Sequence, residues 1–279
     1  MEASLQMKLT RDILKIDFEE ETERILEFIR RVVENSGASG VVLGLSGGVD
    51  SSLTAVLCVK ALGRERVLGV LMPTNFTPRE DVEDALELAE TLGIRVETVN
   101  IDEISEAFFK CLKVDRSDPK ARIPMANIRA RIRMVILYYY ANLRNYLVAG
   151  TRDRSESLIG YFTKYGDGGV DFMPICHLYK TQVRELARHL GVPERIAYKP
   201  SSPQLYPGHK ATDEIPIDYG KLDLILAGLF DLKMEPEEVS KAVEVPLKVV
   251  EEVLHRFRKT MHKRMLPPRI EASGDSASS

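Results

Sequence analysis

From residue 17 onward, helical and strand-like hydrophobic patterns alternate along the chain. Apolar residues recur at helical spacing from Ile25 to Val33, which predicts an amphipathic helix over residues 17–36. Residues 41–45 form a continuous apolar run, which is typical of a parallel strand buried on both faces. A glycine-rich turn follows, and then a pattern that predicts a helix over residues 51–62. The first part of the chain therefore has the order helix, strand, helix.

The same alternation continues as far as residue 149. We expect strands over residues 67–72, 94–99 and 146–149, and helices over residues 79–92, 101–112 and 126–143. Residues 115–123 are polar and contain Pro119, so they predict a loop. Repeated strand–helix units with short connections imply an α/β fold, in which a doubly wound parallel sheet carries helices on both faces.

The second half of the chain is less regular. Between residues 150 and 175 the periodicity disappears, and a loop beside the ends of parallel strands is where open α/β folds bind ligands. Residues 198–216 contain four prolines and predict an irregular segment. Helices are expected over residues 181–190, 219–231, 236–243 and 246–260. We therefore predict one domain over residues 1–270, with a small helical C-terminal part, and a disordered polar tail over 271–279.

Composition limits the classes of function. The 279 residues are 44% hydrophobic and 29% charged, and the net charge of −3 argues against a nucleic-acid partner. No apolar run approaches the roughly 20 residues that span a bilayer, and the N-terminus has no secretory signal. Cys58, Cys111 and Cys176 lie far apart, so we interpret them as buried hydrophobes and not as a disulfide or zinc framework. We expect a cytoplasmic protein without a membrane partner.

The most informative motif is Ser-Gly-Gly-Val-Asp-Ser-Ser at residues 46–52, between a buried strand and a helix. Its glycines allow the backbone to approach a ligand, and its hydroxyls and helix N–H groups suit phosphate. Asp50 would repel phosphate oxygens unless Mg²⁺ lay between them, since Mg²⁺ commonly joins a carboxylate to substrate phosphates. A plain glycine turn is the alternative interpretation. The loop is not a Walker A motif, because no Gly-Lys-Ser/Thr follows.

This loop resembles the SGGxDS loop of the ATP pyrophosphatases, which adenylylate a substrate and release pyrophosphate. Later motifs resemble those of ammonia-dependent NAD synthetases, in order, over roughly residues 20–270. They are the segments 127–134, 150–156, 160–169, 199–202 and 262–264. The resemblance implies a Rossmann-like fold of the adenine-nucleotide alpha-hydrolase type. It also implies amidation of deamido-NAD with ammonia and ATP, which gives NAD, AMP and pyrophosphate.

The resemblance assigns site residues by their positions. ATP would contact Leu45, Ser46, Gly47, Gly48, Val49, Asp50, Ser51, Ser52, Thr151, Lys180 and Ser201, with Ser202 as the alternative to Ser201. Magnesium would bind Asp50 and Glu156. Deamido-NAD would contact Arg131, Lys164, Asp171, His262 and Lys263, the last two across the interface of a homodimer.

Two further roles depend on chemistry. Lys180 stands at a helix start, where the macrodipole disfavours a cation, so a bound anion would explain its position. Ammonia is mostly ammonium near neutral pH, and we expect Asp167 or Asp171 to deprotonate it. Relatives have an acidic Gln-x-Asp-Glu pattern near residues 208–216. This segment keeps the acids but lacks the glutamine, and Pro216 replaces a usual acidic stretch, which leaves the geometry of this lid open.

Other functions remain possible from the loop alone. A tRNA-modifying thiolase would need catalytic cysteines, and it or a lysidine synthetase would need a basic surface. A non-catalytic ATP-binding module would leave the two magnesium carboxylates without a role. Because little sequence precedes residue 40, we expect the nitrogen to come from free ammonia or from a separate glutaminase subunit.

Overall fold

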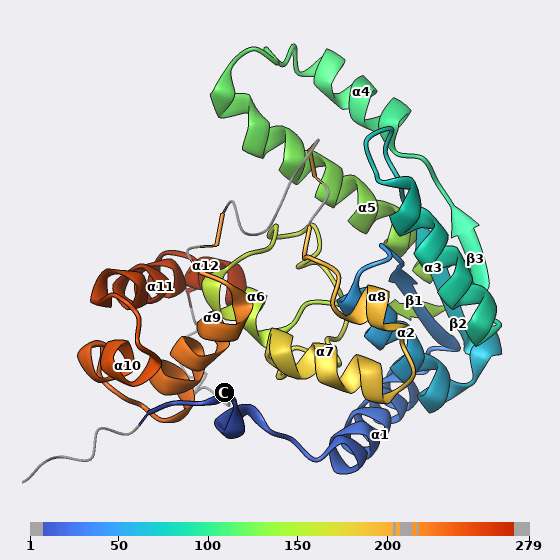
Figure 1. Ribbon diagram of the computed structural model, residues 1–279. Helices are drawn as coiled ribbons and strands as arrows, with labels where there is room; N and C mark the ends of the chain where they lie inside the picture. The colour runs from blue at the N-terminus through green and yellow to red at the C-terminus, as the bar shows by residue number, and fades with distance from the viewer. Residues whose placement is uncertain (1–7, 203–204, 207–213, 216, 271–279) are drawn as a thin grey trace, which may run out of the picture.

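The computed structural model describes residues 8–202, 205–206, 214–215 and 217–270, and a four-stranded parallel sheet lies at its centre (Figure 1). The strand order is β3-β2-β1-β4, and the strands are β1 (Gly40–Gly44), β2 (Val67–Leu71), β3 (Arg95–Thr98) and β4 (Tyr146–Val148). The chain winds from β1 through β2 to β3 and then returns to place β4 on the other side of β1. Ligands of open α/β sheets bind where the winding direction changes, at the carboxyl ends of the strands.

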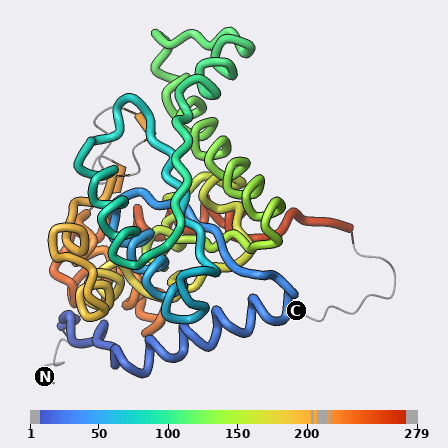
Figure 2. The backbone as a smooth tube through the Cα atoms, turned by 90° about the vertical axis from the view of Figure 1, so that its right-hand side faces the viewer, coloured from blue at the N-terminus to red at the C-terminus, as the bar shows by residue number. Residues whose placement is uncertain are grey.

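Helices cover both faces of the sheet, as the alternating pattern predicted. Helices α1 (Phe18–Ser36), α2 (Val49–Leu62) and α3 (Arg79–Leu92) share one core with Val41 and Leu43. The opposite face carries α5 (Arg122–Arg144), whose core includes Val42 and Val148. Helix α4 (Asp102–Cys111) packs against α5, and the pair extends beyond the sheet (Figures 1 and 2).

A second core lies in the C-terminal part of the chain. It joins α9 (Tyr219–Leu226), α10 (Pro236–Val243) and α11 (Leu247–Lys259). Leu9 and Leu14, from the N-terminal segment, complete this core. The remaining elements are α6 (Arg154–Ile159), α7 (Lys180–His189), α8 (Glu194–Ala197), a π-helical turn (Ala227–Asp231), α12 (Met261–Arg264) and 3-10 turns at Arg11–Leu14, Arg64–Arg66 and Pro119–Ala121. The small helical C-terminal part is therefore present.

The structure differs from the sequence prediction in several places. The interpretation of the cysteines as buried holds for Cys58 but is wrong for Cys111, which is exposed, and for Cys176, which is only partly buried. Helix α5 begins at Arg122 and not at residue 126, because Pro124 lies in the first turn, where a helix needs no N–H donor. The irregular segment 150–175 contains α6, which is too short to show a period and is fixed by its caps, Asp153 and Gly160. Helix α8 was also missed, since it has only four residues.

Some predictions fall beyond the described residues. The tail at 271–279 and most of the lid segment at 208–216 lie outside them. Within the described ranges, no helix combines the length and the apolarity needed to cross a bilayer. The cytoplasmic location stays a prediction.

Candidate active site

The turn between β1 and α2 has the backbone geometry of an anion-binding loop. Gly47 has φ +75°, and a Cβ there would lie 2.1 Å from the carbonyl oxygen of Asp81, so only glycine fits. The hydroxyls of Ser46 and Ser51 lie 3.1 Å apart, and that of Ser51 donates to the carbonyl oxygen of Gly48 at 3.0 Å. The first N–H groups of α2 are left without partners inside the helix, as at every helix start. The loop therefore presents donors to a phosphate.

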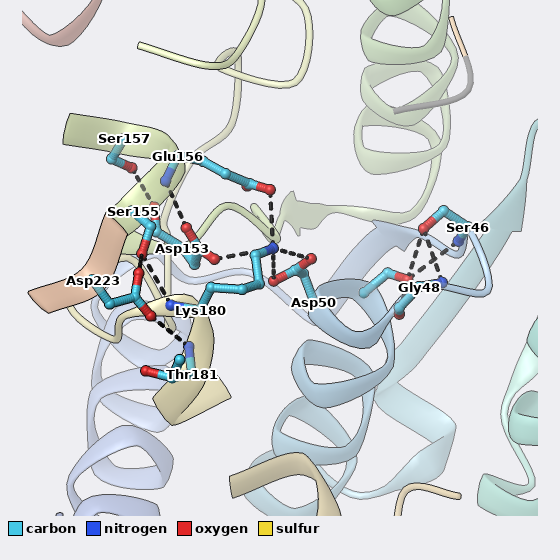
Figure 3. Close-up of polar contacts among 11 residues, drawn as sticks. Ser46, Gly48, Asp50, Asp153, Ser155, Glu156, Ser157, Lys180, Thr181 and Asp223 are labelled. Atoms are coloured by element: carbon cyan, nitrogen blue, oxygen red, sulfur yellow. Dashed lines mark hydrogen bonds and ion pairs between the residues drawn. The ribbon is translucent and has the colours of Figure 1, made fainter. Parts of the chain in front are cut away.

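Three carboxylates surround the ammonium group of Lys180. Its Nζ lies 2.8 and 2.7 Å from the two oxygens of Asp50, 2.9 Å from Glu156 and 3.0 Å from Asp153 (Figure 3). Lys180 and Asp153 are fully buried, while Asp50 and Glu156 keep about a fifth of their side chains exposed, at 22% and 18%. The sequence led us to expect an anion beside Lys180, and the structure places three protein carboxylates there.

Burial and charge shift the pKa values of this cluster in opposite directions. Burial raises the pKa of Glu156 to about 8 and that of Asp153 to about 6, and in both cases Lys180 opposes the shift. Burial alone would lower the pKa of Lys180, but the carboxylates, with Asp153 first, raise it well above its ordinary value. Lys180 is therefore a permanent cation among three acids, and the cluster carries more negative than positive charge.

The residues of this cluster fit Mg²⁺. Carboxylate oxygens are hard donors, and Mg²⁺ commonly takes one or two of them together with substrate phosphates and water. Within the described residues no group of three or more metal-binding side chains has the geometry of a complete metal site. The three acids point at the Lys180 ammonium instead. Asp50 and Glu156, the pair expected from the sequence, are the two that also line the cavity, and their role as metal ligands stays a prediction.

A buried carboxylate fixes the two elements that carry this cluster. Asp223, on α9, accepts a hydrogen bond from the hydroxyl of Ser155 at 2.6 Å and one from the N–H of Thr181 at 2.8 Å. The Ser155 hydroxyl in turn accepts from the N–H of Lys180 at 3.0 Å. Asp223 thus connects the start of α7 to α6, the helix of Glu156.

Sequence reasoning did not single out Asp153, Ser155 or Asp223. Asp153 could have been found, because an acid three residues before Glu156 is the signature of a helix N-cap. Asp223 interrupts an apolar run between Leu222 and Leu224, and a charge in such a run signals a buried polar partner.

A cavity of about 810 Å³ opens above the carboxyl ends of β1 and β4. A volume of this size is typical of small-molecule sites. The residues assigned from the sequence that line it are Leu45, Ser46, Gly48, Val49, Asp50, Ser51, Thr151, Glu156, Asp167, Ser201, Ser202 and Lys263. Gly47, Ser52 and Lys180 are buried and are not part of the lining.

Four further assigned residues lie outside the cavity lining. Arg131 donates to the carbonyl oxygen of Lys164 at 3.2 Å, and the Lys164 ammonium donates to that of His262 at 2.8 Å. These three form an outer cluster. Asp171 accepts hydrogen bonds from the hydroxyl of Tyr138 at 3.0 Å and from the N–H of Val148 at 2.7 Å. The structure therefore gives Asp171 partners at β4 and α5, away from the cavity.

Asp167, the other candidate base, lines the cavity. The N–H of Thr163 donates to its carboxylate at 2.8 Å. Although Asp167 is exposed, the protein atoms packed around its carboxylate desolvate it and raise its pKa, while the Thr163 N–H and the charges of Arg152 and Lys263 oppose the shift. Between the two candidates, Asp167 alone has the position of a base for the cavity.

The comparisons with known proteins agree over nearly the whole chain. The model of the NAD synthase family matches residues 21–267. The chain is 53% identical over 264 residues to the NH3-dependent NAD+ synthetase of Hyperthermus butylicus, and the match covers 94% of each protein. The structure of NMN synthetase from Francisella tularensis is similar with a TM-score of 0.80 at 32% identity. The NH3-dependent NAD synthetase of Campylobacter jejuni, in complex with nitrate, gives 0.76 at 33% identity. Both alignments cover 92% of this chain and all of the other.

Proposed function

Because the chain belongs to the NAD synthase family, we propose that it amidates the nicotinate carboxylate of deamido-NAD through an adenylate. It is an ATP-using ligase of NAD biosynthesis with ammonia-dependent NAD synthetase activity, as its motifs predicted. The tRNA-modifying and non-catalytic alternatives are accordingly set aside.

One observation carries the proposed chemistry: Lys180 joins Asp50 of the phosphate loop to Glu156 beyond β4. These two segments follow neighbouring strands, so a triphosphate bound at the loop would have its inner phosphates beside the ammonium. The positive charge of Lys180 and the N–H groups at the start of α2 would offset the negative charge that builds up on the pyrophosphate as it leaves. This arrangement favours bond breaking at the α phosphorus.

In the first step, the nicotinate carboxylate attacks the α phosphorus of ATP and pyrophosphate leaves. In the second, ammonia attacks the mixed anhydride and AMP leaves with its bonding electron pair. Asp167 would accept the proton that ammonium must lose before it can attack. The hydrogen bond from Thr163 holds this carboxylate at the cavity wall.

Mg²⁺ is the cofactor that the carboxylate set suits. Asp50 and Glu156 would hold it, and when bound it would supply positive charge to the phosphates. Lys180 is held by Asp153 as well, so it would keep one buried acid partner while the other two acids turn to a metal.

We also propose that the chain forms a homodimer. Val135, Tyr139 and Leu143 are each more than 60% exposed and follow one another at four-residue spacing along α5. Arg131 extends the same stripe by one turn toward the outer cluster. An apolar stripe of this kind is typical of an interface, and a second copy would bury it beside the outer-cluster residues assigned to deamido-NAD.

The test is a product analysis. The protein is incubated with ATP, Mg²⁺, deamido-NAD and ammonium, and nucleotides are separated and quantified. We expect AMP, pyrophosphate and NAD in equal amounts. Nicotinate mononucleotide in a parallel reaction distinguishes the activity named for the Francisella relative, and glutamine in a third tests the nitrogen source. ADP with orthophosphate would overturn the proposed chemistry.

A further inference from the structure

Among the described residues, Arg152 is a buried cation that forms no salt bridge with a carboxylate. The residue is 7% exposed and lines the cavity immediately after Thr151. Its Nε donates to the hydroxyl of Ser157 at 2.8 Å and its Nη2 to the thioether of Met173 at 3.1 Å. Its Nη1 has no hydrogen-bond partner among the described residues. Burying a guanidinium against only a hydroxyl and a sulfur is costly, and such groups normally pair with an anion.

The surroundings of Arg152 add positive charge. Its Cζ lies 3.6 Å from the centroid of the Phe162 ring, and the ammonium of Lys263 lies 5.3 Å from the same centroid. Lys263 is held there by the carbonyl oxygens of Gly160 and Phe162, at 2.8 and 2.7 Å. Carbonyl oxygens and an aromatic face attract cations but do not neutralise them. Asp167 is the acid whose charge interacts with both cations.

The cavity therefore has two ends of opposite sign. At the acidic end, three carboxylates face one lysine. At the basic end, the cations Arg152, Lys263 and Arg264 interact with one another and outnumber the acids there, Asp167 and Glu214. Side chains of successive residues on an extended segment point in opposite directions, which is why Arg152 and Asp153 contribute to different ends. Triphosphate and metal suit the acidic end, so the basic end is left for the other anionic reactant.

We propose that Arg152 binds the carboxylate of the nicotinate ring and so distinguishes the acid substrate from the amide product. A planar guanidinium can donate two parallel hydrogen bonds to the two oxygens of a carboxylate and pair with its negative charge. A carboxamide has one acceptor oxygen and no charge. Conversion to the amide would remove this charge pairing and favour release of NAD. The inference rests on the proposed function, because it takes deamido-NAD as the substrate.

The phosphates of the dinucleotide are the other source of negative charge. Deamido-NAD and NAD carry the same diphosphate and differ only at the pyridine substituent. A contact with the carboxylate must therefore affect deamido-NAD alone, whereas a contact with phosphate must affect both. Binding of the two compounds thus separates the two sources.

The experiment compares Arg152→Met with the wild-type protein by isothermal titration calorimetry, using deamido-NAD and NAD in turn. Methionine keeps an unbranched side chain against Phe162 but removes the charge. We expect the Kd for deamido-NAD to rise about tenfold or more, the usual range for a lost hydrogen bond to a charged group, while the Kd for NAD changes about twofold or less. Arg152→Lys, which keeps the charge but not the fork, should give an intermediate Kd for deamido-NAD.

Arg154→Met is the matched control. Arg154 lies two residues away, outside the cavity lining, and pairs with Asp231. The Kd values of the Arg154→Met variant for deamido-NAD and for NAD should equal those of the wild-type protein. If Arg152→Met does not fold, as judged by circular dichroism, the Arg152→Lys comparison decides in its place.

Equal increases for both compounds in the Arg152 variants would assign the contact to phosphate and overturn the proposal, as would unchanged values for both. A wild-type protein that neither binds nor converts deamido-NAD would instead contradict the proposed function itself. The two failures are therefore distinguishable.

Discussion

The carboxylate of Asp223 accepts a hydrogen bond from the hydroxyl of Ser155 at 2.6 Å, and this contact connects α9 to α6 (Figure 3). The other oxygen of Asp223 accepts from the N–H of Thr181, in the first turn of α7. A carboxylate from one helix therefore caps the start of another, next to the lysine that faces Asp50 and Glu156. The relative position of Lys180 and Glu156 depends on a residue that contacts neither side chain.

This relationship predicts that Asp223→Asn impairs turnover more than substrate binding. Asparagine has one acceptor oxygen in place of two, so it cannot accept from both the Ser155 hydroxyl and the Thr181 N–H as Asp223 does. The start of α7 would therefore shift, and Lys180 with it. We expect kcat to fall by about tenfold or more, equivalent to about 1.4 kcal/mol in the barrier, with KM for ATP changed much less. Steady-state kinetics of pyrophosphate release would measure both constants.

Asp218→Asn is the control for this effect, because Asp218 also caps a helix start but is not among the residues lining the cavity. It should leave kcat unchanged. An Asp223→Asn enzyme with wild-type kcat, or one whose KM rises while kcat is kept, would contradict a positioning role.

Much of the α/β part could be predicted from the sequence for a simple physical reason. Strands buried on both faces must be continuously apolar, as residues 41–45 are, and the amphipathic helices that cover them repeat every 3.6 residues. Both patterns are local. The phosphate loop could also be predicted, because its glycines and hydroxyls lie together in one short turn of consecutive residues.

Contacts between distant segments could not be predicted from the sequence. Lys180 is 130 positions from Asp50, and Asp223 lies 68 positions from Ser155. Contacts between residues so far apart in sequence leave no periodic pattern. Neither the acids around Lys180 nor the hydrogen bonds that Asp223 accepts could therefore be predicted. Helix α6 was missed because six residues are too few to show a period.

Asp50→Ala should abolish adenylate formation while leaving the fold intact. The substitution removes the carboxylate nearest the phosphate loop, and Asp153 and Glu156 remain as partners for the buried ammonium of Lys180. We expect no pyrophosphate above background and a circular dichroism spectrum like that of the wild-type protein. Asp50→Asn, which keeps the volume but not the charge, should behave in the same way. Wild-type pyrophosphate release from either variant would refute the assignment.

Asp167→Asn should separate the two half-reactions. Adenylate formation would persist, but loss of the base should slow the ammonia step by about 100-fold or more. The adenylate would then hydrolyse in part, and NAD formed per pyrophosphate released should fall below one. An unchanged ratio at the wild-type rate would exclude Asp167 as the base.

The same residue predicts a pH dependence. Desolvation by the surrounding protein atoms raises the pKa of Asp167 above its ordinary value, and a carboxylate acts as a base only when ionised. The contribution of Asp167 is therefore complete above the raised pKa and is lost as the pH falls through it. Rates measured at constant free ammonia should show this acid limb in the wild-type protein, and Asp167→Asn should remove it.

Gly47→Ala should destabilise the protein through a steric clash. The new methyl group would lie 2.1 Å from the carbonyl oxygen of Asp81 at a backbone φ of +75°. Gly37→Ala is a matched control, since its φ is +69° but no atom lies within 4 Å of the added Cβ. We expect Gly37→Ala to lower the free energy of unfolding by about 1 kcal/mol from backbone strain alone, and Gly47→Ala by about 3 kcal/mol or more. Chemical denaturation would measure both, and equal losses would contradict the clash.

The stripe on α5 predicts that the oligomeric state can be changed without touching the cavity. Val135 and Tyr139 are each 61% exposed, and neither lines the cavity. A two-fold interface would bring the stripes of both subunits together. Replacing both residues with glutamate would therefore place negative charges on each side of the interface, where they repel one another.

We expect the double variant to sediment as a monomer in analytical ultracentrifugation at a concentration where the wild-type protein is a dimer. The KM for deamido-NAD should rise, because the neighbouring outer cluster of Arg131, Lys164 and His262 would lose its partner subunit. The KM for ATP should change little, because the phosphate loop joins β1 to α2 and is not part of the stripe or of the outer cluster. Leu86→Glu is the control: Leu86 is 44% exposed on α3, outside the stripe, and its change should leave the dimer intact. A wild-type protein that sediments as a monomer, or a double variant that stays dimeric, would show that the stripe is not the interface.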